Sequence, residues 1–81
     1  MDFKDAQDFL HIADNAYRVG AYTESLEIVR RLAYFVIGEN GLSAEERSAL
    51  TDAVVKAIAR FHDCPDECTW EDSCGLMDLF R

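Results

Sequence analysis

The chain has 81 residues, of which 49% are apolar, and its 16 acidic residues against eight lysines and arginines give a formal net charge of −8. This length and composition predict one small folded domain of modest stability and exclude a disordered chain. The acidic balance disfavours direct binding to nucleic acid or to anionic membranes, because both need clustered lysine and arginine, and it favours a protein partner with a basic surface.

The first predicted helix starts after Asp2, a good N-cap residue, and stops near Gly20, because glycine tolerates the left-handed conformation that follows a helix. Its main apolar face repeats at steps of three and four: Phe3, Ala6, Leu10, Ala13 and Tyr17. Phe9, Ile12 and Ala16 form a second apolar strip. The two strips together predict that this helix contacts two neighbours.

The second predicted helix runs from about residue 22 to residue 37 and ends at Gly38. It is apolar on two sides. One strip holds Leu26, Val29, Ala33 and Val36, and the other holds Ile28, Leu32 and Phe35. A helix that is apolar on two sides has few faces left for solvent, so we expect it to be the central and most buried one.

The third predicted helix has the clearest start in the chain. In "SAEE", Ser43 stands three residues before Glu46, which is the spacing of a capping box. The apolar face that follows consists of Leu50, Val54, Ala57, Ile58 and Phe61. Pro65 limits further extension, because the residue before a proline is disfavoured in the helical conformation.

A short fourth helix is predicted from Trp70 to Phe80, with Thr69 as its cap. No alternation of period two indicates a strand. The sequence therefore predicts an all-α fold, a small three- to four-helix bundle built on an antiparallel helical hairpin. Within this single domain, residues 1–62 form a three-helix core, and residues 63–81 form an acidic tail, containing cysteine and tryptophan, whose short helix packs on the core.

Residues 9–32, "FLHIADNAYRVGAYTESLEIVRRL", resemble one hairpin of a tetratricopeptide repeat. Large, small and turn residues stand where the repeat has them: Phe9, Ile12, Ala13, Gly20, Tyr22, Ser25, Val29 and Leu32. Ala16 departs from the large aromatic residue that is usual there, and Ser43, one repeat length after Phe9, replaces a large apolar residue. The resemblance implies a single helical hairpin.

A longer stretch, about residues 9–61, resembles the first three helices of 14-3-3 proteins in order and spacing, including the "EER" after the third predicted cap. That family binds phosphopeptides through a lysine and an arginine on its third helix. Lys56 matches the lysine, but Asp63 stands at the position of the arginine, which argues against phosphopeptide recognition. The resemblance implies a helical-hairpin topology and pairing through the first helix, so it allows a homodimer.

Four residues of the types that bind zinc lie close together near the C-terminal end. His62, Cys64, Cys68 and Cys74 follow the pattern H-x-C-x3-C-x5-C. The paired C-x2-C spacing of common zinc sites is absent, and the predicted fourth helix would hold Cys74 away from the others. Small, buried or idle thiols are therefore the favoured interpretation, and we expect neither a metal nor a cofactor.

The sequence favours a non-enzymatic protein. His62 and Cys64 are close enough in sequence for a base and a nucleophile, but Asp63, Asp66 and Glu67 around them would raise the pKa of the thiol. A glycine-rich phosphate loop and the H-E-x-x-H motif are both missing from the sequence. A bundle of this size also has little room for a substrate pocket.

The sequence predicts a cytoplasmic protein, located in the host cytoplasm if a phage encodes it. No apolar run approaches the ~18 residues that a membrane-spanning helix needs. The first residues, "MDFKDAQDFLHIAD", are acidic and interrupted by charges, unlike a secretory signal. In that compartment the three cysteines are expected to be reduced.

Acidic residues are concentrated at the C-terminal end. Residues 63–81 carry six acids and one base, whereas residues 1–62 carry ten acids and seven bases. One interpretation is a solvated face that keeps a small protein soluble. The other is a partner-binding segment in which carboxylates surround aromatic anchors. The predicted partner-binding residues are Asp63, Asp66, Glu67, Trp70, Glu71, Asp72, Asp78 and Phe80.

Two functions from different classes fit these features. The favoured one is a stoichiometric inhibitor or decoy that occupies a basic nucleic-acid-binding surface of a partner, as phage antagonists of restriction or CRISPR complexes do. The alternative is a helical-hairpin adaptor or assembly module. A decoy is expected to show its acids as one continuous patch, whereas an adaptor is expected to show an apolar groove and scattered acids.

Overall fold

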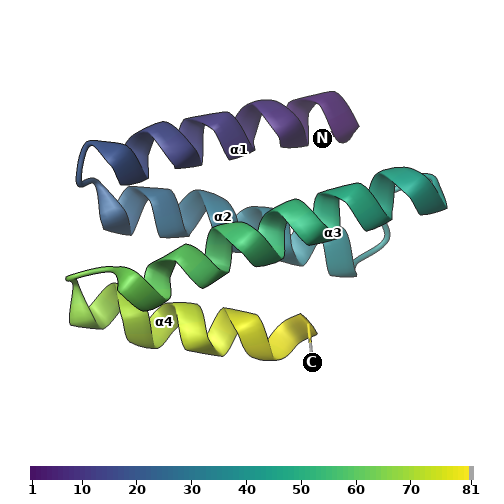
Figure 1. Cartoon of the computed structure of the whole chain (residues 1–81). Coiled ribbons are helices and arrows are strands. Elements are labelled where there is room, and N and C mark those ends of the chain that lie inside the picture. Colours follow the sequence, from purple (N-terminus) through teal and green to yellow (C-terminus); the bar gives the residue numbers. More distant parts are fainter. Residues whose placement is uncertain (81) are drawn as a thin grey trace.

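The computed structural model describes residues 1–80, without the side chains of residues 67 and 68, and shows an all-α bundle (Figure 1). Its elements are α1 (Phe3–Arg18), α2 (Tyr22–Ile37), α3 (Ala44–Ala59), the 3-10 turn η1 (Arg60–Asp63), α4 (Glu67–Met77) and the 3-10 turn η2 (Asp78–Phe80). Successive helices alternate in direction, and α1 and α2 form the first antiparallel hairpin. Along residues 1–80, no helix combines the length and the apolar content needed to cross a bilayer.

Helix α2 is the centre of the bundle, as its two apolar sides predict, and it contacts α1, α3 and α4. The residues expected to be most buried are all inaccessible to solvent or nearly so: Leu26, Val29, Leu32, Ala33 and Val36. Ser25 is also buried, and its hydroxyl donates a hydrogen bond of 2.7 Å to the carbonyl of Ala13. This bond satisfies a buried polar group and joins α1 to α2 where both side chains are small.

Helix α1 contacts both α2 and α3, and its main apolar face packs in or against the core. Asp2 caps its start by accepting a hydrogen bond from the backbone of Asp5, and Gly20 follows its end with a positive φ of 85°. The prediction that α1 has two neighbours is confirmed, but two residues of the second strip contribute little to these contacts, because Phe9 is 41% exposed and Ile12 is 51% exposed.

The capping box of α3 is confirmed. The hydroxyl of Ser43 accepts a hydrogen bond of 3.1 Å from the backbone N–H of Glu46, whose carboxylate accepts one of 3.1 Å from the backbone N–H of Ser43. From this start, the predicted apolar face turns toward the core and buries Leu50, Val54, Ile58 and Phe61. The helix tightens into η1 at Arg60, so Phe61 reaches the core from the 3-10 turn.

Replacing Ser43 with alanine is expected to cost about 1 kcal/mol of unfolding free energy, because the N–H of Glu46 loses its acceptor. Urea denaturation followed by circular dichroism measures this loss. Ser48→Ala is the matched control, since Ser48 is exposed within α3 and caps nothing, and it is expected to change stability by a few tenths of a kcal/mol at most. Equal losses in the two variants would contradict a stabilising cap at Ser43.

The predicted start of the fourth helix is wrong by three residues. Helix α4 begins at Glu67, and Thr69 is not its cap but a buried residue inside it. The backbone N–H of Trp70 donates to the carbonyl of Asp66 at 3.0 Å, and the hydroxyl of Thr69 donates to the carboxylate of Asp66 at 2.6 Å. Asp66, which follows Pro65, thus takes the capping position that aspartate favours. The regular helix ends at Met77, and η2 completes the segment.

Candidate interaction surfaces

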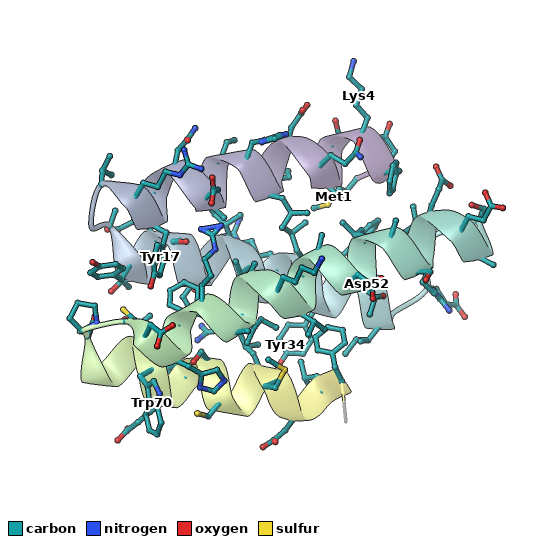
Figure 2. The ribbon with its side chains drawn as sticks, viewed as in Figure 1. Met1, Lys4, Tyr17, Tyr34, Asp52 and Trp70 are labelled. Atoms are coloured by element: carbon teal, nitrogen blue, oxygen red, sulfur yellow. The ribbon has the colours of Figure 1, made fainter. Side chains whose placement is uncertain are left out.

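Helix α4 packs one side against α2 and α3 and leaves a tryptophan on an exposed flank. Thr69, Ser73 and Leu76 lie on the buried side. Trp70 is 43% exposed, and its ring meets the ring of His62 edge-on with 6.5 Å between the centroids. Figure 2 shows Trp70 pointing away from the bundle. Its indole thus contacts His62 on one side and is exposed on another, where a partner protein could contact it.

Three exposed carboxylates belong to the same end segment as this tryptophan. They are Asp63 in η1, Glu71 in α4 and Asp78 at the start of η2. Residues 63–80 contain no lysine or arginine that would neutralise them locally. Asp72 of α4 is exposed as well, and its carboxylate approaches the guanidinium of Arg30 in α2 at 3.7 Å. Four acidic residues of the predicted set are therefore exposed, and Asp72 among them also pairs with α2.

The remaining predicted partner-binding residues have other positions. Asp66 caps α4, and its carboxylate accepts the hydroxyl hydrogen of Thr69. Phe80 is partly buried and packs against the core. The side chain of Glu67 lies outside the described residues. The structure thus leaves Trp70 as the most accessible aromatic residue of the predicted set.

Exposed acids also occur elsewhere in the bundle. Asp5 and Asp8 are exposed on α1, Glu24 on α2, and Glu45 and Asp52 on α3. Exposed carboxylates thus lie on α1, α2 and α3 as well as in the end segment, which is the scatter expected of an adaptor and not the one continuous patch expected of a decoy. What distinguishes the end segment is the lack of bases between residues 63 and 80, because each of α1, α2 and α3 carries at least two lysines or arginines.

A cavity of about 320 Å³ lies between α1 and α3, and sequence reasoning missed it. Its walls come from Leu10, Ala13, Ala53, Ala57 and Phe61, and Val29 of α2 lies at its base. A second, smaller cavity of about 210 Å³ continues it toward the start of α1 and shares Leu10, His11 and Ala53. The one available clue was the pair of alanines four residues apart on α3, since small side chains on adjacent helices leave space between them.

A set of contacts around Tyr17 closes one end of this cavity. The hydroxyl of Tyr17 donates a hydrogen bond of 3.0 Å to the carbonyl of Arg60, whose guanidinium lies 5.3 Å from the centre of the tyrosine ring. The same guanidinium forms an ion pair with Asp14, which also pairs with Arg18 at 3.1 Å. The ring of Phe61 stands edge-on to that of Tyr17 at 5.2 Å. These contacts tie the end of α1 to η1.

The pKa of Tyr17 is raised above the ordinary value of a tyrosine. Burial of the phenol is the largest cause, and the nearby Cys64, Tyr22 and Asp63 add to it, while the Arg60 guanidinium opposes them. The folded state thus favours the neutral phenol, which is the form that donates to Arg60. This stabilisation is fully present below the unfolded pKa of about 10 and is lost as pH rises through the higher folded pKa.

We expect Tyr17→Phe to lower the unfolding free energy by about 1 kcal/mol at neutral pH, the usual size of one hydrogen bond. Above pH 10 this difference is expected to shrink as the wild-type phenol ionises. Absorbance of tyrosinate at 295 nm, compared between the two proteins, isolates the titration of Tyr17. A Tyr17 midpoint at or below 10 would contradict the contacts described around its hydroxyl.

The residues weighed as zinc ligands do not form a described cluster. His62 is exposed, and Cys64 and Cys74 are half-buried free thiols. Among the side chains that the structure describes, no three His, Cys, Asp or Glu residues gather as metal ligands would. The prediction for Cys68 lies outside the described side chains.

Comparisons with known proteins add no family to this geometry. No protein-family model matches the chain, and searches of the curated proteins and of the solved structures find no match. The resemblances to a tetratricopeptide hairpin and to 14-3-3 proteins therefore stay predictions from the sequence.

Proposed function

We propose that this protein is a non-enzymatic, stoichiometric binding protein that occupies a basic nucleic-acid-binding surface of a partner protein. The end segment, defined as residues 63–80, is the proposed contact surface. The observation that carries the proposal is the exposed Trp70 in a segment that holds six acids and no base. Inhibition of a restriction or CRISPR complex is the kind of role that this arrangement suits.

In this proposal, negative charge guides the protein to its partner, and the Trp70 side chain holds the complex together. A net charge of −8 draws the protein toward a basic surface, and complementary charge raises the rate of association. Asp63, Glu71 and Asp78 would then stand where phosphates of the nucleic acid bind. Charge alone gives little residence time, whereas a partly apolar indole that becomes buried slows dissociation, and tryptophan is enriched among such anchors.

A second candidate function is a helical-hairpin adaptor or self-association module. Two observations favour it: the exposed strip on α1 and the exposed carboxylates scattered over α1, α2 and α3. Phe9 and Ile12 are 41% and 51% exposed, and Val19, at the end of the helix, is 81% exposed. The 14-3-3 resemblance implies pairing through this first helix. Neighbouring exposed apolar side chains are typical of protein contacts. In this case the end segment would only keep the protein soluble.

The decoy hypothesis predicts different kinetic effects for charge and for the anchor. Against a partner recovered from the source cell, the double variant Asp63→Asn/Glu71→Gln is expected to slow association several-fold, with little effect on dissociation. Trp70→Ala is expected to speed dissociation by tenfold or more, roughly the effect of losing an interface anchor. Surface plasmon resonance measures both rates, and affinity should fall steeply above physiological salt.

Matched controls separate these effects from general ones. Asp5→Asn/Asp8→Asn changes the net charge equally on α1, and Tyr34→Ala removes an exposed aromatic ring from α2. Both are expected to bind almost as the parent does. The partner should also release its nucleic acid as one equivalent of this protein binds. Binding that is insensitive to salt and to the end-segment variants, but is lost in Ile12→Asp, would favour the adaptor instead.

A further inference from the structure

The cavity between α1 and α3 has the dimensions and walls of a small-molecule site. Its volume of about 320 Å³ lies at the lower end of the ~300–1,000 Å³ range of ligand pockets. In Figure 1, α1 and α3 diverge toward the C-terminal end of α1, where this cavity lies. Six apolar residues line it: Leu10, Ala13, Val29, Ala53, Ala57 and Phe61.

The cavity is lined by two basic residues, Lys56 and Arg60, and one acidic residue, Asp14, although the chain as a whole is acidic. Arg60 lies at one end and is already held by Asp14 and Tyr17. Lys56 lies on the α3 side and His11 on the α1 side. Lys56 is exposed and makes no ion pair with any described residue, so its ammonium is available to an anion that enters from solvent.

We propose that this cavity binds a compact apolar carboxylate. The apolar part would lie against Ala53, Ala57 and Val29, and the carboxylate would accept hydrogen bonds from the ammonium of Lys56 at the rim. A neutral apolar molecule would leave that ammonium unused, and a cation would meet Lys56 and Arg60. The site uses α1 and α3 and does not involve the end segment, so it goes beyond the proposed function and does not depend on it.

The arrangement at the closed end supports a defined binding position. Because the Arg60 guanidinium pairs with Asp14 and lies over the ring of Tyr17, this residue acts as a fixed wall rather than as a mobile second cation. Lys56 is therefore the cation that would bind the carboxylate, and the apolar part of the ligand would contact the apolar lining, which includes Val29. This geometry favours monocarboxylates over dianions such as phosphate.

The probe for this proposal is 4-phenylbutyrate, titrated into the full chain and followed by two-dimensional amide NMR. Saturable shifts are expected at the backbone amides of Ala13, Ala53 and Ala57. Lys56→Gln is expected to weaken binding of the probe about tenfold, because one charge-assisted hydrogen bond is lost. Lys4→Gln removes the same charge from an exposed position on α1 and is expected to leave affinity unchanged.

Two further experiments test the apolar lining of the cavity and the sign of the charge on the ligand. Ala57→Leu places a larger side chain in the cavity and is expected to remove saturable binding, while the spectrum of the folded variant stays dispersed. The amine 4-phenylbutylamine, which has the same ring and chain length, is expected to bind at least tenfold more weakly than the carboxylate. The proposal is overturned if shifts at the cavity are absent, if the amine binds equally well, or if Lys56→Gln binds as tightly as the parent.

Discussion

Replacing Leu32 with aspartate is expected to unfold most of the protein at room temperature. Leu32 is fully buried in α2, the helix that contacts all three others. An aspartate there places a carboxylate among apolar side chains without a hydrogen-bond partner, at a cost of several kcal/mol. A domain of this length has roughly 4–12 kcal/mol of unfolding free energy in total. The cost of this one substitution is therefore comparable with the whole stability.

Thermal and urea unfolding measure this effect, with Tyr34→Asp as the matched control. Tyr34 lies two residues further along α2 and is 56% exposed. The substitution Tyr34→Asp changes the net charge by the same amount as Leu32→Asp. The control is expected to stay folded, with a change near the ordinary size for surface substitutions, about 0.5 kcal/mol. If Leu32→Asp melted within a few degrees of the parent, α2 would not be the central helix.

Local features of the fold were predictable because each depends on a few neighbouring residues. Ser43 and Glu46 stand at the spacing of a capping box and form one. Asp2 caps α1 as expected, and Gly20 and Gly38 follow the ends of the first two helices. Capping satisfies backbone groups within one turn, so the sequence holds all the information that the contact needs. The helix periods likewise predict the core of α2 correctly.

The error at the start of α4 shows the limit of such local rules. Thr69 and Asp66 are both acceptable caps, and sequence alone does not rank them. The structure places Asp66 at the cap because Thr69 and Ser73 then lie on the side of α4 that faces the bundle, together with Leu76. Packing against α2 and α3 therefore decided between two local solutions, and that packing is not contained in the segment itself.

Tertiary arrangement also decided which apolar residues became surface. Periodicity found two strips on α1 but does not say how many helices cover them, and Phe9 and Ile12 remain exposed. The cavity between α1 and α3 is hidden from the sequence for the same reason. It depends on side chains of three helices that approach one another only in the fold, with Ala53 and Ala57 too small to fill the space.

The second large effect is expected at Phe61, whose ring joins η1 to the core. Phe61 is 1% exposed, stands edge-on to Tyr17 at 5.2 Å and forms a wall of the α1–α3 cavity. Phe61→Ala removes the buried ring and enlarges a space that is already present. The expected loss is about 3–5 kcal/mol, the usual cost of truncating a buried phenylalanine. In a small domain this leaves little unfolding free energy.

Phe9→Ala makes the same chemical change on the exposed strip of α1 and is the control for Phe61→Ala. Because Phe9 is 41% exposed, its truncation removes less buried area and is expected to cost about 1 kcal/mol or less. Urea denaturation of both variants gives the two losses on one scale. Phe61→Leu, which keeps part of the buried volume, should fall between the two. If Phe61→Ala lost no more unfolding free energy than Phe9→Ala, the ring of Phe61 in η1 would not lie in the core. The α1–α3 cavity would then lack this wall as well.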